Sequence, residues 1–472
     1  MRKLPFFLSF AVVVATACGQ RPSGPSFTPG FTPQTSRSFG ASGIATVPYG
    51  AAGPSLLGGG KITHVIIIVQ ENRSFDNMFH QFPHADSADY GETSNGGRVR
   101  LFPERLTEPM DISHTHESFN VEYNGGRMDG FNLAQSRCKN KDQDKGSCRN
   151  SDRHPYGYVP RWEIKPYWVM ASQYVLADRM FQTNEGPSFP AHQYLVSGTS
   201  TISNRSPLRA AENAHVGGGG GQGGCDSRTG TTVRLIDEDG NENHKMFPCF
   251  TRTSLMGRIT AAGLTWHYYQ AHLGHGLWNA PDAIRSIRYG RLYHTDVVAP
   301  QTKVLHDIAH GNLANVVWVT PSKSASDHAG VNDGSGPAWV ASVVNAVGES
   351  RYWNHAVIFV TWDDWGGWYD HVKPPQYNSY ELGFRVPLIV ISAYAKAHYV
   401  SHPEHEFGSI LKFTEKALGL GSLGTTDVRS DDLDDCFNFF AKPRPFKIIP
   451  ASLPPGYFES QPISNEEPDD DF

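Results

Sequence analysis

The sequence predicts an α/β protein with a central, mostly parallel β-sheet that is flanked by helices and carries long loop insertions. Short apolar runs rich in β-branched residues recur along the chain between long segments, which is typical of strands buried on both faces. The 47 glycines and 32 prolines among 472 residues indicate many loops. A hydrophobic content of 39% is enough for a real core and excludes global disorder.

The expected strands and helices follow from these runs. Four apolar runs are the main strand candidates, and one weaker run is a fifth: residues 64–69, 314–320, 356–362 and 386–392, with 264–269 as the weaker one. The helix candidates are residues 339–347 and 407–418. Alternating strands and helices of this kind favour a single large α/β domain with insertions.

The N-terminus has the features of an export signal. Two basic residues and an apolar run over 4–14 precede Cys18, and the run is too short to cross about 30 Å of hydrocarbon. Residues 1–18 are therefore expected to be a signal peptide. The stretch before Cys18 is similar to a lipobox, although Ala15 stands where leucine is usual. We predict an exported protein: a periplasmic or cell-surface lipoprotein tethered to the membrane through Cys18 or, after ordinary cleavage, a secreted protein.

Composition divides the remaining chain into three parts. Residues 19–60 are rich in Ser, Pro, Gly and Thr and are expected to be a flexible linker. The catalytic body is expected at 61–445, followed by a C-terminal tail with an acidic end at 446–472. The formal net charge of −6 gives no basic field that would attract nucleic acid, so nucleic-acid partners are not expected.

Export makes the cysteines disulfide candidates, because exported proteins meet an oxidising environment. The simplest pairing joins Cys138 to Cys148 and Cys225 to Cys249, and it leaves Cys436 odd. Other pairings stay open. The spacings of the cysteines do not match a structural zinc site.

Polar pairs follow two of the predicted strands directly. Glu71 and Asn72 come after the run at 64–69, and Asp363 and Asp364 come after the run at 356–362. Ligands of open α/β sheets bind at the carboxyl ends of strands. Three carboxylates placed together repel one another unless a cation is present. We therefore predict an oxygen-rich site for a divalent cation, with calcium, magnesium or manganese as the metal.

A nucleophile candidate lies where Gly186 and Pro187 interrupt the chain just before Ser188. A serine at such a turn presents its hydroxyl at the start of a helix, where N–H groups favour bound phosphate. A bound cation would lower the hydroxyl pKa and activate it as a nucleophile.

Histidines supply the remaining candidates for phosphate binding and acid–base chemistry. His114 and His116 are expected on one side of an extended segment. Further candidates follow two strands, namely Asp327 with His328 and, after the Asp363 pair, His371.

Four motifs together resemble one family, the bacterial phosphoesterases that comprise non-specific phospholipases C and acid phosphatases of the alkaline-phosphatase-like fold. They are ENRSFDNMF at 71–79, YNGGRMDGF at 123–131, DDWGGWYDHVKPP at 363–375 and GFRVPLIVISAYAK at 383–396. The resemblance covers most of residues 61–440. It implies an alkaline-phosphatase-like fold for the catalytic body.

The resemblance also implies roles for individual residues. Glu71, Asn72, Asp363, Asp364 and Ser188 would hold the metal. Plant phospholipases C of this kind carry the nucleophile in Thr-x-Pro-Asn-Arg, and alignment on Pro190 places it at Ser188, as in the family's acid phosphatases. The motif's Asn-Arg becomes Ala191-His192 here, so His192 would replace the arginine in binding phosphate. His116 and His328 would act on the leaving group, with His114 as the alternative to His116; His114, Asp327 and His371 join His192 as substrate-binding candidates.

These features predict a hydrolase of phosphate esters that forms a phosphoserine intermediate. The leading interpretation is a phospholipase C-like phosphodiesterase acting on a phosphate ester such as a phospholipid. The alternatives are an acid phosphatase and a lipid-tethered surface protein that binds without catalysis. The sequence leaves the oligomeric state open.

Overall fold

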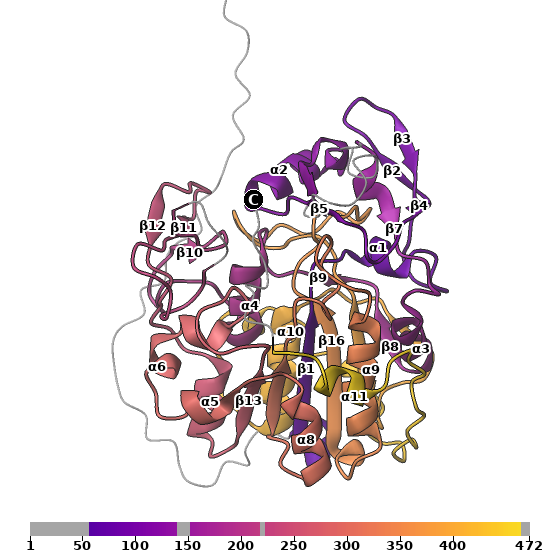
Figure 1. Ribbon diagram of the computed structural model, residues 1–472, viewed down its shortest axis with the longest axis vertical. Helices are drawn as coiled ribbons and strands as arrows, with labels where there is room; N and C mark the ends of the chain where they lie inside the picture. The colour runs from indigo at the N-terminus through magenta and orange to yellow at the C-terminus, as the bar shows by residue number, and fades with distance from the viewer. Residues whose placement is uncertain (1–55, 139–151, 218–221, 464–472) are drawn as a thin grey trace, which may run out of the picture. The chain divides into compact units, whose positions relative to one another are not determined.

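An eight-stranded sheet forms the centre of the protein in this computed structural model, which describes residues 56–138, 152–217 and 222–463 (Figure 1). Across the sheet the order is β14 (Val297–Val298), β13 (Trp266–Tyr269), β15 (Val316–Val319), β1 (His64–Gln70), β16 (Ala356–Trp362), β17 (Leu388–Ser392), β8 (Val175–Ala177) and β18 (Tyr399–Ser401). β17 is antiparallel to both of its neighbours, and the other pairings are parallel. The predicted α/β class with a mostly parallel sheet is confirmed.

The two central strands set the position of everything that follows them. β1 and β16 pair in parallel along their whole length, from His64 opposite Ala356 to Gln70 opposite Trp362. Nearly all their side chains are buried on both faces, which explains why their sequences are continuous apolar runs. Because the strands end in register, the residues that follow them emerge side by side, and Asp363 N donates to Gln70 O at 3.0 Å.

Helices flank this sheet in two groups (Figure 1). One group consists of α3 (Lys165–Gln173), α8 (Lys303–His310), α9 (Gly336–Gly348) and the short α11 (Pro455–Glu459). The other consists of α4 (Ser188–Ser197), α5 (Leu255–Ala261) and α10 (Phe407–Leu418). α9 contains the helix expected at 339–347, and α10 has the predicted bounds. Across the described parts of the chain, no helix is both long enough and apolar enough to span a membrane.

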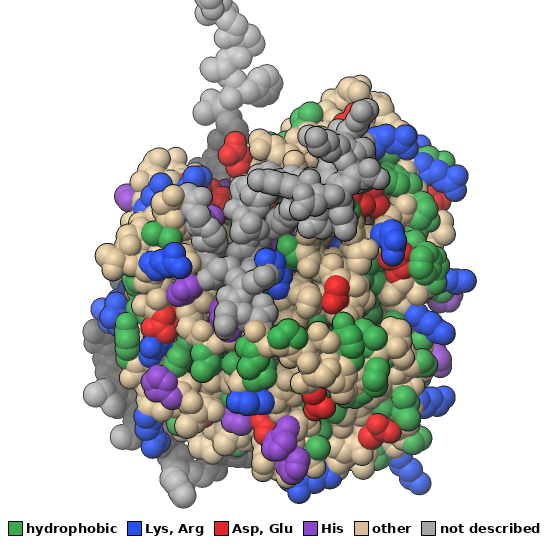
Figure 2. All heavy atoms as spheres, viewed as in Figure 1, with side chains coloured by type: hydrophobic (Ala, Val, Ile, Leu, Met, Phe, Trp, Pro, Cys, Tyr) green, Lys and Arg blue, Asp and Glu red, His purple; other side chains and the backbone are tan. Residues whose placement is uncertain are grey.

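Short elements fill the long insertions between these strands and helices. The helices are α1 (Phe75–Phe79), α2 (His116–Tyr123), α6 (Arg285–Arg288) and α7 (Tyr293–Asp296). The strands are β2 (Tyr90–Glu92), β3 (Arg98–Arg100), β4 (Phe102–Pro103), β5 (Met110–Ile112), β6 (Ser136–Cys138), β7 (Gly157–Tyr158), β9 (Met180–Phe181), β10 (Arg209–Ala210), β11 (Val233–Ile236), β12 (His244–Met246) and β19 (His405–Glu406). Figure 1 shows α2 and β2 to β5 beyond the carboxyl ends of β1 and β16. On the face in Figure 2, basic, acidic and apolar side chains are interspersed.

Both ends of the predicted catalytic body are extended by residues that pack against it. Residues 57–60 form a 3₁₀ turn that contacts α10. In the predicted tail, Ile449 and Phe458 are buried, and the Phe458 ring packs on Trp339 of α9 at 5.4 Å. The signal peptide, Cys18, most of the linker and the acidic end lie outside the described residues, so those assignments stay predictions.

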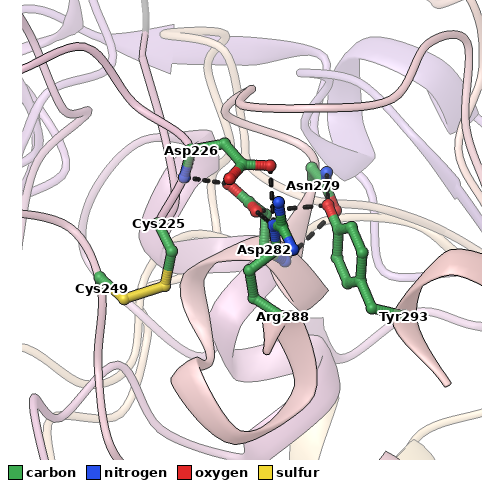
Figure 3. The surroundings of a disulfide bond; sticks show 7 residues. All are labelled: Cys225, Asp226, Cys249, Asn279, Asp282, Arg288 and Tyr293. Carbon is green, nitrogen blue, oxygen red and sulfur yellow. Dashed lines mark hydrogen bonds and ion pairs between the residues drawn. A yellow bond between two sulfur atoms is a disulfide. The ribbon is translucent and has the colours of Figure 1, made fainter. Parts of the chain in front are cut away.

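The predicted disulfide between Cys225 and Cys249 is present (Figure 3). It adjoins a buried network in which Asp226 N donates to Asp282 Oδ2 at 3.0 Å and Arg288 pairs with both carboxylates. Cys436 is a buried free thiol. The predicted partner of Cys138 lies outside the described residues, and so does that pairing.

Removing this disulfide is expected to destabilise the protein. The bridge closes a loop with a sequence separation of 24 residues, and such a crosslink lowers the entropy of the unfolded chain by an amount worth about 3 kcal/mol. The double variant Cys225→Ser/Cys249→Ser should therefore unfold at a lower denaturant concentration than the wild type. Urea unfolding of both proteins under non-reducing conditions measures the difference. An unchanged midpoint would contradict the expectation.

Candidate active site

The two predicted polar pairs meet at the carboxyl edge of β1 and β16. Glu71, Asn72, Asp363 and Asp364 are all at most 1% exposed, and Asn72 N donates to Asp363 Oδ1 at 3.2 Å. Asn72 adopts a left-handed conformation with φ 56°, which asparagine tolerates better than most residues. Gly366 makes this turn possible, because a Cβ there would lie 2.3 Å from the Asn72 carbonyl oxygen.

Ser188 reaches the same place from the first turn of α4. Its Oγ donates to Asp364 Oδ2 at 3.1 Å and lies 3.4 Å from Glu71 Oε2. Gly186 allows the tight approach to the helix, since a Cβ there would meet Tyr380 Oη at 2.5 Å. The structure therefore brings together all five residues predicted to hold a metal. It also confirms that Ser188 begins a helix.

The Asn72 amide tests whether these residues suit a cation. With its Oδ1 toward the carboxylates, that oxygen lies 2.9 Å from Glu71 Oε2 and 3.1 Å from Asp363 Oδ1, and its nitrogen lies 2.9 Å from His114 Nε2. His114 Nδ1 donates to the Ile112 carbonyl at 2.7 Å, and a ring that carries its single proton there accepts at Nε2 from the amide nitrogen. The amide oxygen and the two carboxylate oxygens then face one another and repel. A cation bound among them would attract all three. The reversed amide would hydrogen-bond both carboxylates when no cation is bound.

The charges at the edge lead to the same conclusion. Glu71, Asp363 and Asp364 are fully buried, and Asp363 Oδ2 has no hydrogen-bond partner. Three carboxylates packed together in a low-dielectric interior repel one another strongly. Oxygen-only donors of this kind fit a hard divalent cation, and the residues present therefore suit the predicted metal.

His192 lies one helical turn after Ser188 and faces the same carboxylates. Its Nε2 lies 3.0 Å from Glu71 Oε1 and 3.7 Å from Asp363 Oδ2, and one ligand atom from each of the three residues falls within 4.8 Å of the others. Burial lowers the pKa of His192 to about 4, although the Asp363 charge raises it, so the ring is neutral at pH 7. The ring contacts two metal-ligand candidates directly.

The two histidines of the His-Thr-His segment point to different partners. Thr115 caps α2, so His116 is already helical, and the expectation of one extended segment is wrong. His114 contacts Asn72, and its ring lies 5.8 Å from that of His328. The structure therefore brings His114 to the metal-ligand candidates and places His328 beside His114.

His116 lies instead between a buried and a partly buried carboxylate. Its Nδ1 lies 2.6 Å from Glu242 Oε1, and its Nε2 lies 3.6 Å from Glu185 Oε2. Burial alone would lower the pKa of His116, but hydrogen bonds and charges from Glu185 and Glu242 raise it to about 9. The ring is therefore an imidazolium at pH 7. Glu185 precedes Ser188 by three residues, which ties this cluster to the nucleophile segment.

A match to a protein-family model identifies the family of this chain. The model described as the phosphoesterase family matches residues 62–421, which include every residue of the edge cluster. The chain belongs to the phosphoesterase family.

Relatives of this phosphoesterase agree with the match. The chain is 23% identical over 461 residues to a non-hemolytic phospholipase C of Pseudomonas aeruginosa, covering 82% of this chain but only 59% of that protein. It thus spans little more than half of that relative's length. Phospholipase C B of Mycobacterium tuberculosis is 23% identical, with 82% and 79% of the two chains covered. The solved phosphonate monoester hydrolase SpPMH from Silicibacter pomeroyi shares 11% identity and a TM-score of 0.30, covering 55% and 69%.

Two other residues that were predicted to bind substrate, Asp327 and His371, contact side chains of the phosphoesterase itself. Asp327 Oδ2 accepts from Tyr167 Oη at 2.8 Å and Trp362 Nε1 at 3.0 Å, and burial raises the pKa of Asp327 to about 7. His371 Nδ1 lies 2.6 Å from Asp76 Oδ2, and its Nε2 lies 3.1 Å from Asp86 Oδ1. Their predicted contacts with substrate stay predictions.

The sequence interpretation missed the carboxylates around His116. Glu185 lies inside the segment that contains Ser188, so its position was a usable signal. Glu242 follows the acidic turn between β11 and β12, where a solvated loop is the natural interpretation. Asn213 was also missed, although its Oδ1 accepts from Phe189 N at 2.8 Å beside the nucleophile.

Proposed function

We propose that this phosphoesterase is an exported, metal-dependent hydrolase of phospholipase C type that uses Ser188 as its nucleophile. The observation that carries the proposal is the Ser188 hydroxyl, which lies at the start of α4 within hydrogen-bonding distance of Asp364 and Glu71. The helix N-terminus favours a phosphate at this place. The phospholipase C names of the relatives support the substrate class.

Glu71, Asn72, Asp363, Asp364 and Ser188 would hold the cation, which we propose to be calcium, magnesium or manganese. When bound, it would supply positive charge that lowers the pKa of the serine hydroxyl and neutralises the phosphate. Asn72 keeps its oxygen toward that cation because its nitrogen donates to His114.

The reaction would then proceed in two steps on these residues. Ser188 Oγ would pass its proton to Asp364 and attack phosphorus, the bond from phosphorus to the leaving oxygen breaks, and that oxygen takes a proton from a histidine. The product is a phosphoserine on Ser188 and a free alcohol. In the second step water attacks the phosphoserine and gives a proton to the same histidine, and Ser188 recovers its proton from Asp364 as phosphate or its monoester leaves.

Of the two proposed acids, His116 is favoured by its protonation state. Its neighbours Glu185 and Glu242 keep the ring an imidazolium, which can donate a proton. His328 is the alternative and lies beside His114.

The pH dependence of turnover tests His116. With a pKa of about 9, the acid is lost only as pH rises through 9, so kcat should fall on that alkaline limb. Glu242→Gln removes one charge that raises the pKa of His116, so the alkaline limb of kcat should move to lower pH by about one unit. The raised pKa of His116 also stabilises the folded protein below pH 6.5, and this stabilisation is lost as pH rises through 9. The test compares kcat as a function of pH for Glu242→Gln and for the exposed control Glu238→Gln. If the two variants have the same alkaline limb, His116 is not the acid that protonates the leaving group.

Substrate comparison is the direct test of this proposal. Release of phosphocholine from phosphatidylcholine is measured beside hydrolysis of an aryl phosphate, with and without added divalent cation. Turnover of both, or of the lipid alone, supports the phospholipase C type. Turnover of the aryl phosphate alone would make the protein a phosphomonoesterase, and no turnover of either would favour a surface protein that only binds.

A further inference from the structure

A second cluster of metal-binding side chains lies on elements that do not build the active site. His405 belongs to β19, while Asp435 and Cys436 belong to the 3₁₀ turn η8 (Asp434–Cys436). One ligand atom from each of the three residues lies within 4.8 Å of the others. Cys436 Sγ is 3.5 Å from Asp435 Oδ1, and His405 Nε2 is 3.9 Å from the same oxygen.

The donor set differs from the one beside Ser188, which contains no sulfur. An imidazole nitrogen, a thiol sulfur and a carboxylate oxygen are the three kinds of donor that zinc takes in proteins. Zinc bond lengths of about 2.0 to 2.3 Å place tetrahedral ligand atoms roughly 3.3 to 3.7 Å apart. The two distances from Asp435 Oδ1, 3.5 Å to Cys436 Sγ and 3.9 Å to His405 Nε2, are within a few tenths of an ångström of that range, so small side-chain movements would bring these atoms to zinc-binding positions.

An outer carboxylate lies beside the histidine nitrogen that would not bind the metal. His405 Nδ1 lies 2.9 Å from Asp431 Oδ1, while Nε2 on the other side of the ring faces Ser401 and Asp435. Histidines that bind metals are usually held this way by a carboxylate on the other ring nitrogen. Asp431 is not one of the three clustered residues.

The residues around the cluster provide a fourth polar group beside the three ligands and a route by which a cation could enter. Ser401 Oγ lies 2.9 Å from His405 Nε2 and also donates to Asp435 Oδ2, so its oxygen lies beside two of the three ligands. His405 and Cys436 are at most 1% exposed, while the Asp435 side chain is 24% exposed. A cation could therefore enter past Asp435 and be shielded from water by the other two.

We propose that His405, Asp435 and Cys436 bind a zinc ion that fastens η8 to β18 and β19. Binding replaces the thiol S–H bond by a sulfur–zinc bond, and the proton passes to solvent. α10 begins at Phe407, directly after β19, so the ion would also anchor the start of this helix. The role is structural and is independent of the proposed phosphoesterase chemistry.

Cobalt substitution of the full-length protein tests the site. Cobalt(II) bound by a thiolate produces a strong near-ultraviolet charge-transfer absorption, which oxygen ligands such as those around Ser188 do not produce. We expect this absorption in the wild type and in Asp363→Asn, and its loss in Cys436→Ser and His405→Gln. Metal analysis after zinc loading should show one zinc less per chain in those two variants, and they should melt at a lower temperature.

Two results would overturn the proposal. The first is a folded, cobalt-loaded wild type without the thiolate absorption, which needs no variant to fold. The second is a folded Cys436→Ser protein with the zinc content of the wild type. Either result would leave the cluster with only its hydrogen bonds to Ser401 and its contact with Asp431.

Discussion

Replacing Ser188 by alanine is expected to reduce kcat by about 10⁴-fold or more, because loss of a nucleophile removes the covalent route altogether. The metal should remain bound, although less tightly, since Glu71, Asn72 and Asp363 still converge. Acid-quenched reactions with labelled substrate should leave label on the wild-type chain and none on the variant. Parallel measurements of turnover and metal content separate loss of the nucleophile from loss of the cation.

Two controls make this result specific. Ser197→Ala removes another buried serine hydroxyl from the same helix and should leave kcat near the wild-type value. Ser188→Thr keeps a hydroxyl and should recover part of the activity that alanine removes. Unchanged hydrolysis in Ser188→Ala would end the assignment of Ser188 and would leave the metal site without its nucleophile.

The centre of the fold and most of the site could be predicted because local signals and global topology agree there. β1 and β16 are continuous apolar runs, and their parallel register alone brings Glu71 next to Asp363. By contrast, β8, β14 and β18 have only two or three residues each, and such short segments carry no periodic signal. Their pairing is determined by the neighbours in the sheet.

The histidines show where sequence reasoning stops. His114 and His116 are separated by one residue, yet the cap at Thr115 begins a helix between them and sends the rings to different partners. Two distant carboxylates raise the pKa of His116, Glu185 and Glu242, and the second lies 126 residues later in the chain. Contacts of this kind depend on how insertions fold over the sheet edge, which spacing within one motif does not reveal.

Asp363→Asn is expected to change the stability of the protein in a direction that depends on the metal. Without metal, the variant should be more stable than the wild type by about 1 kcal/mol, because it removes one of the three mutually repelling buried carboxylates. With saturating metal the order should reverse, since losing a ligand should weaken binding by about 100-fold or more and remove the stabilisation that bound metal provides. Activity should fall with the metal.

Melting curves with chelator and with added calcium, magnesium or manganese measure both halves of this expectation. The exposed Asp239→Asn loses the same charge elsewhere and should change neither curve. A variant that is less stable than the wild type in chelator would mean that the carboxylates are stabilising without a cation. In that case the convergence of Glu71, Asp363 and Asp364 would be a hydrogen-bonded feature of the fold, and the metal would have to bind elsewhere. The opposite result would show that the wild type accepts a less stable metal-free state to keep a site ready for its cation.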